Sequence, residues 1–134
     1  MILGFLSKYR DFGLLILRIG LGVMFLWHGY PKLIGGPGIW EKLGMAMTVI
    51  GVKTLPVFWG FMAAFSEFFG GICLILGILF RPACILLTTT MAVAATMHLG
   101  KGDGLKVAYH AIEDGIVFLS LIFIGPGKYS IDKK

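Results

Sequence analysis

Four apolar segments, each about as long as a membrane-spanning helix, constrain this chain more than any other feature. They run at 12–33, 56–80, 82–99 and 107–124. A helix needs about 20 mostly apolar residues to cross roughly 30 Å of hydrocarbon. Only 14% of the 134 residues are charged and 57% are hydrophobic, unlike a soluble globule. We therefore predict an all-α integral membrane protein, a four-helix transmembrane bundle that forms one domain over 1–134.

The connection between the first two segments is the longest and the most structured. Gly and Pro residues at 35–38 interrupt helicity, and the stretch from Ile39 to Val49 that follows is amphipathic. We expect a short interfacial helix or a structured loop there. The later connections are shorter, a turn at Arg81 and Pro82 and the glycine-rich stretch 100–104.

The distribution of positive charge bears on orientation and excludes one class of partner. The twelve Lys and Arg residues are scattered singly, without a basic run, so we expect no nucleic-acid binding. Four spans would place both termini on one side of the bilayer. The positive-inside rule then favours both termini in the cytoplasm.

Ionisable side chains inside or beside the four segments are the candidates for chemistry. Each costs several kcal/mol in a bilayer unless it is paired or hydrated. The set comprises Arg18, His28, Lys32, Glu67, His98, His110, Glu113 and Asp114. A structural reading competes with a functional one, because Arg and Lys side chains can snorkel, histidines can lie among headgroups, and carboxylates can cap helices.

Glu67 is the hardest of these residues to explain as a surface group, because it lies midway along the second segment. A small-residue surface that includes Gly70 and Gly71 surrounds it, which is typical of a close helix-packing face. We therefore expect Glu67 to point into the protein, paired with an Arg or Lys or protonated.

A bound metal, flavin or haem is not indicated by the sequence. His110 and Glu113 have the i, i+3 spacing that some helical bundles use for metal ligands, but the pattern occurs once. No dinucleotide motif and no paired redox cysteines are present. A redox role would therefore require electrons from a partner subunit.

Three sequence stretches together resemble one family. They are RIGLGVMFLWHGYPKL at 18–33, EFFGGICLILGILFRPA at 67–83 and GPGKYSID at 125–132, and their order and spacing are similar to those of the DoxX family. The resemblance implies a small four-span protein of the cell inner membrane. Members of this family are linked to thiosulfate:quinone oxidoreductase, to quinone detoxification and to membrane redox complexes.

A quinone as substrate would give the ionisable residues a role, because protonatable groups in an apolar bundle can bind quinone carbonyls and deliver protons. We predict Glu67, His98 and Glu113 as catalytic residues. We predict Arg18, His28, Lys32 and His110 as substrate-binding residues.

Three hypotheses of different classes remain open. The first, which we favour, is a membrane subunit of a quinone-linked oxidoreductase complex with a redox partner subunit. The second is a non-catalytic scaffold or assembly subunit whose buried charges only pair helices. The third is a protein that binds or transports a lipid or another small molecule. Glycine-rich helix faces would also allow a homo-oligomer in the lipid bilayer.

Overall fold

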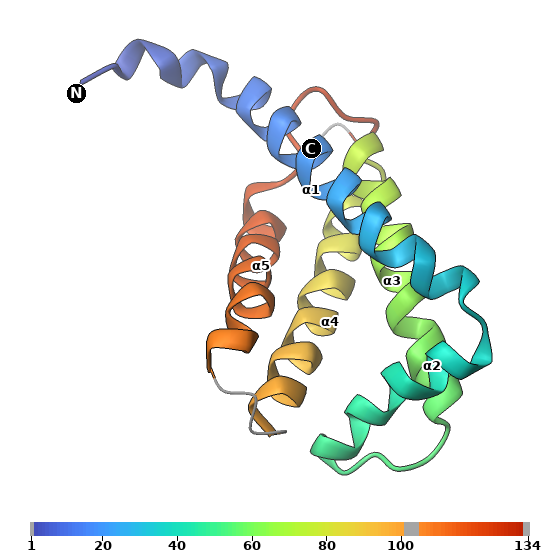
Figure 1. The fold of residues 1–134 in the computed structure, drawn as a ribbon. Helices are drawn as coiled ribbons and strands as arrows, with labels where there is room; N and C mark the ends of the chain where they lie inside the picture. Colours follow the sequence, from blue (N-terminus) through green and yellow to red (C-terminus); the bar gives the residue numbers. More distant parts are fainter. Residues whose placement is uncertain (1, 101–104, 133–134) are drawn as a thin grey trace.

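The computed structural model describes residues 2–100 and 105–132, and within these residues it contains helices and no strand (Figure 1). Two are 3-10 helices, η1 (Gly4–Tyr9) and η2 (Met45–Ile50). The five α-helices are α1 (Arg10–Ile34), α2 (Pro37–Gly44), α3 (Pro56–Leu76), α4 (Phe80–Gly100) and α5 (Leu105–Ile124). The all-α prediction is confirmed, and the expected structured connection contains α2 and η2.

Within the described residues, three helical segments are long and apolar enough to cross a membrane. They are Gly4–Ile34, which joins η1 to α1, then α3, and Phe80–Leu99 of α4. Large apolar side chains lie exposed on the outside, among them Trp27, Ile116 and Phe123. Such an exterior requires a lipid bilayer around it. The expected fourth segment, 107–124, lies within α5, which is not among these three, so a four-span bundle stays a prediction.

The turn between α3 and α4 differs from its prediction. We expected the second segment to continue to residue 80, but α3 ends at Leu76 because Gly77 adopts a left-handed conformation with φ 68°. The backbone N–H groups of Leu79 and Phe80 donate to the Asp132 carboxylate at 2.9 and 2.7 Å. A residue 52 positions away from Phe80 thus caps the start of α4.

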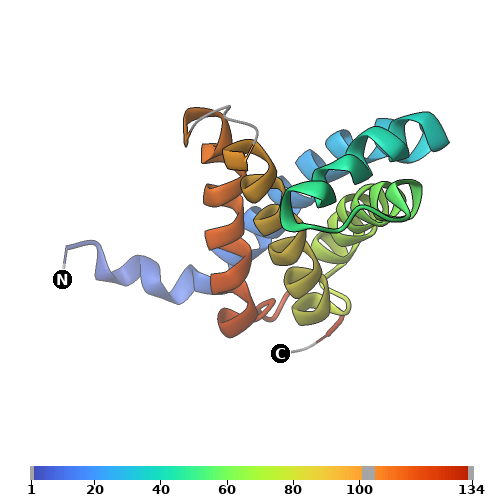
Figure 2. The same cartoon turned by 90° about the horizontal axis from the view of Figure 1, so that it is seen from below.

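The helices form two groups, which Figure 2 shows from below. In one group α1 and α2 both pack against α3, and in the other α4 packs against α5. The groups meet in an apolar core, where the rings of Phe25 on α1 and Phe118 on α5 lie edge to face at 5.1 Å. Both views show the N-terminal segment extending away from the bundle (Figures 1 and 2).

Glycines permit the close approach of α1 to α3. A Cβ atom at Gly29 would lie 2.8 Å from the backbone nitrogen of Phe68, and one at Gly22 would lie 2.7 Å from the carbonyl oxygen of Gly71. Any larger side chain at either position would push the two backbones apart. The small-residue face predicted around Gly70 and Gly71 is thus a helix-packing surface.

Candidate functional site

An ion pair joins α1 to α3 near the end of α1. Lys32 Nζ lies 3.0 Å from Glu67 Oε1 and 3.1 Å from Glu67 Oε2. The Glu67 side chain is 7% exposed and that of Lys32 is 35% exposed. Gly29 creates this geometry, because α1 touches α3 at Glu67 and Phe68 there, and Lys32 follows one helical turn later. The prediction that Glu67 points into the protein is confirmed, and of the two alternatives left open, a basic partner or protonation, the structure shows a basic partner.

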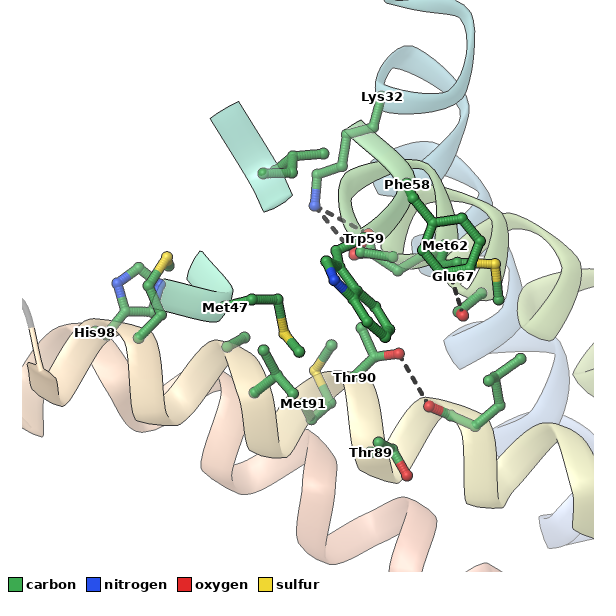
Figure 3. Close-up of a pocket in the computed structure, with 17 residues that line it drawn as sticks. Lys32, Met47, Phe58, Trp59, Met62, Glu67, Thr89, Thr90, Met91 and His98 are labelled. Atoms are coloured by element: carbon green, nitrogen blue, oxygen red, sulfur yellow. Dashed lines mark hydrogen bonds and ion pairs between the residues drawn. The ribbon is translucent and has the colours of Figure 1, made fainter. Parts of the chain in front are cut away.

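A cavity of about 570 Å³ lies beside this ion pair (Figure 3). Its walls come from α3 and α4, with contributions from α2 and η2 and with Lys32 from α1. Most of the lining is apolar, and methionines at 47, 62, 91 and 97 supply much of it. The polar side chains that line the cavity are Lys32, Trp59, Ser66, Glu67, Thr89, Thr90 and His98.

The hydroxyl groups in the cavity donate their protons to the helices that carry them. Ser66 Oγ donates to the carbonyl oxygen of Met62 at 2.6 Å, and Thr90 Oγ1 donates to that of Leu86 at 2.9 Å. Thr89 makes the same kind of bond to Ile85. These bonds leave only hydroxyl lone pairs, so the three side chains can accept hydrogen bonds from a ligand.

The side chains that α3 and α4 contribute to the cavity differ in exposure. Phe58 on α3 is 47% exposed and Thr89 on α4 is also exposed, whereas Ser66 and Glu67 are buried deeper inside. Both helices belong to the segments apolar enough to cross a membrane. The cavity is thus lined by two helices that are apolar enough to lie in a bilayer.

Arg18 lies at the opposite end of α1 and does not line the cavity. Its side chain is 1% exposed and donates to four backbone carbonyls. Nε donates to Leu74 at 3.0 Å, Nη2 to Ile75 at 3.0 Å, and Nη1 to Pro126 at 3.1 Å and Tyr129 at 2.8 Å. These bonds join the closing segment, residues 125–132, to the end of α3. The role of Arg18 in substrate binding stays a prediction.

The remaining predicted residues form a separate group that does not line the cavity. Asp114 on α5 is partly buried and interacts electrostatically with His110, Glu113 and His28, the last from α1. His28, His110 and Glu113 are exposed. The structure thus brings Lys32, Glu67 and His98 together at one cavity and places Glu113, predicted as catalytic, elsewhere.

Sequence reasoning missed Trp59, Ser66 and Thr90, which line the cavity. A signal for Thr90 was available, because Thr90, Ala94 and His98 follow one another at four-residue spacing and so lie on one face of α4. Ser66 directly precedes Glu67 in an otherwise apolar helix. Nothing in the sequence distinguishes Trp59 from an ordinary interfacial tryptophan.

Comparison with known proteins places the chain among bacterial membrane proteins. An uncharacterized protein of Haemophilus influenzae is 32% identical over 143 residues, covering 96% of this chain and 95% of the relative. The Escherichia coli inner membrane protein YqjF is 30% identical over 133 residues, again covering 96% and 95%. The inner membrane protein YphA of the same species is 27% identical over 141 residues, covering 95% and 97%.

No solved structure matches the chain. The family model described as DoxX matches residues 13–99, a range that includes Lys32, Glu67 and His98. The resemblance seen in the sequence motifs is therefore confirmed. This chain belongs to the DoxX family.

Proposed function

We propose that this protein binds a quinone in the cavity beside Lys32 and Glu67, as the membrane subunit of a quinone-linked oxidoreductase complex. The observation that carries the proposal is the combination of an apolar cavity, lined by two helices apolar enough to cross a membrane, with an ion pair in its wall. A volume of about 570 Å³ lies within the range typical of small-molecule sites.

The chemistry of the cavity suits a quinone. Lys32 has three N–H groups and uses hydrogen bonds to two carboxylate oxygens, which leaves a donor for a quinone carbonyl. Reduction to the quinol adds two electrons and two protons, one proton to each oxygen. A soluble redox partner would supply the electrons, and Lys32, Glu67 and His98 would relay the protons from solvent.

The proposal includes α5 as a fourth span and both termini on the cytoplasmic side of the inner membrane. α5 has 20 residues, which is long enough to cross the hydrocarbon region. Arg18 holds the closing segment beside the end of α3, so residues 125–132 lie at the same end of the bundle as the beginning of α1. Four spans would give this arrangement.

A scaffold or assembly subunit is the second candidate, and the ion pair itself favours it. Lys32 and Glu67 join α1 to α3, as a purely structural pair would. A third candidate, lipid binding or transport, is favoured by the mostly apolar lining of the cavity, which a lipid chain could also contact. Both alternatives predict that the cavity does not bind a quinone specifically.

Equilibrium dialysis of the purified, detergent-solubilised protein with a short-chain quinone tests the proposal. We expect saturable binding by wild type, weakened at least tenfold in Glu67→Gln and in His98→Ala. Glu113→Gln is the matched control, because this exposed carboxylate does not line the cavity. Circular dichroism must show that each variant is folded. The absence of saturable binding by wild type would reject the quinone proposal.

A further inference from the structure

Trp59 places a buried hydrogen-bond donor in the wall of the cavity without an acceptor. Its Nε1 is buried, and none of the residues that the structure describes accepts a hydrogen bond from it. The indole projects from α3 and lies between the Lys32–Glu67 pair and the α4 residues Thr90 and Met91 (Figure 3). A buried polar group without a partner costs free energy, and such groups in native proteins usually have a functional explanation.

The other tryptophans show that this situation is specific to position 59. The chain has three tryptophans. Trp40 Nε1 donates to the carbonyl oxygen of Lys32 at 3.0 Å, and Trp27 is 76% exposed on the outer face of α1. Position 59 therefore differs from both: its N–H is neither paired nor exposed.

The neighbouring groups in the cavity do not accept the Trp59 proton but would complement a ligand. Lys32 donates to both carboxylate oxygens of Glu67, and its third N–H is a second available donor. A ligand with two acceptor oxygens could accept one hydrogen bond from Trp59 and one from Lys32. Because the charges of Lys32 and Glu67 offset each other, the cavity offers no net attraction to an anion. The apolar walls likewise favour a neutral molecule.

We propose that Trp59 Nε1–H donates a hydrogen bond to a carbonyl oxygen of a neutral, lipid-soluble ligand in this cavity, and so selects ligands that carry such an oxygen. This inference rests on the proposed quinone site and deepens it by assigning one quinone carbonyl to Trp59. Lys32 is the donor for the other carbonyl. The ligand supplies the acceptor that residues 2–100 and 105–132 do not provide for Trp59.

Two probes of nearly equal shape separate hydrogen bonding from apolar burial. Menadione has two carbonyl oxygens, and 2-methylnaphthalene has the same fused rings and methyl group without them. We expect Trp59→Phe to weaken menadione binding roughly three- to tenfold, as expected for one lost hydrogen bond. Binding of 2-methylnaphthalene should be unchanged, because phenylalanine keeps an aromatic ring in the wall. Trp27→Phe is the control and should bind both probes like wild type.

A direct readout complements the affinities. In protein labelled with ¹⁵N-tryptophan, the Trp59 indole N–H resonance is the one missing from Trp59→Phe. Menadione should move this proton resonance downfield, as a new hydrogen bond does. 2-Methylnaphthalene, which has no acceptor oxygen, should cause no such downfield change. Equal menadione affinity of folded Trp59→Phe and wild type would overturn the inference and leave the quinone site standing. If wild type binds no quinone, the proposed function fails and this inference fails with it. If Trp59→Phe does not fold, the Trp59 resonance can be assigned by elimination from Trp27→Phe and Trp40→Phe, because the chain has three tryptophans, and the indole shift of the unaltered chain still tests the inference.

Discussion

Lys32 on α1 holds both carboxylate oxygens of Glu67 on α3, at 3.0 and 3.1 Å, where the two backbones touch at Gly29. This single relationship connects the packing of the bundle to its candidate site, because the same pair forms part of the cavity wall. Substitutions that disturb the pair should therefore change both the stability of the fold and the affinity for a ligand. Substitutions away from the pair and the cavity should change stability without changing affinity.

Removing one member of the pair should destabilise the fold more than removing both charges. Glu67→Gln or Lys32→Met should each cost about 1–3 kcal/mol, less than a fully buried pair because Lys32 is 35% exposed. The double variant should recover part of this loss, since no uncompensated charge remains. Thermal unfolding in detergent, followed by circular dichroism, measures all three. A double variant less stable than both single variants would contradict the prediction.

Gly29→Ala should weaken ligand binding without altering any polar group. The new Cβ atom would lie 2.8 Å from the backbone nitrogen of Phe68, so α1 must move away from α3 and carry Lys32 with it. Gly20→Ala on the same helix is the matched control, because a Cβ there meets no atom within 4 Å. We expect a lower melting temperature and lower quinone affinity for the first variant only. Equal behaviour of the two variants would refute the close-packing argument.

Arg18→Gln should release the closing segment, residues 125–132, from the end of α3. Four carbonyl groups lose their donor, which should cost about 2–5 kcal/mol. Arg18→Lys should restore little, because an ammonium group does not reproduce the planar fork of guanidinium. Faster hydrogen exchange at 125–132 is the specific readout, with exposed Arg10→Gln as control. Unchanged exchange in Arg18→Gln would argue against this role.

Single cysteines at exposed positions should report whether α5 crosses the bilayer. Native Cys73 and Cys84 are buried, so a membrane-impermeant maleimide should not modify them. With four spans, Lys8→Cys and Lys128→Cys should react only after the membrane is broken, and Lys53→Cys should react in intact cells from which the outer membrane has been removed. If Lys128→Cys and Lys53→Cys react on the same side, α5 does not span the bilayer.

Local sequence pattern predicted the elements of this protein well. Apolar segments of about 20 residues form helices because a bilayer leaves backbone groups no other partners. The mid-helix position of Glu67 was enough to predict its burial, since an unpaired carboxylate is costly there, but it left open whether Glu67 is paired or protonated. The end of α3 at Leu76 was missed because the turn depends on Gly77 and on the distant carboxylate of Asp132.

Only the tertiary structure decided which ionisable side chains lie together at the cavity and which lie elsewhere. Helical periodicity indicates which residues share a face of one helix, but not how that helix is rotated against its neighbours. The glycine contacts between α1 and α3 set that rotation and bring Lys32 to Glu67, with His98 across the cavity from α4. Arg18, at the other end of α1, meets carbonyl groups instead, and Asp114 interacts with His28 outside the cavity. The amino-acid sequence thus determined which segments are helical and apolar enough for a membrane, while side-chain packing between helices decided which charged residues meet.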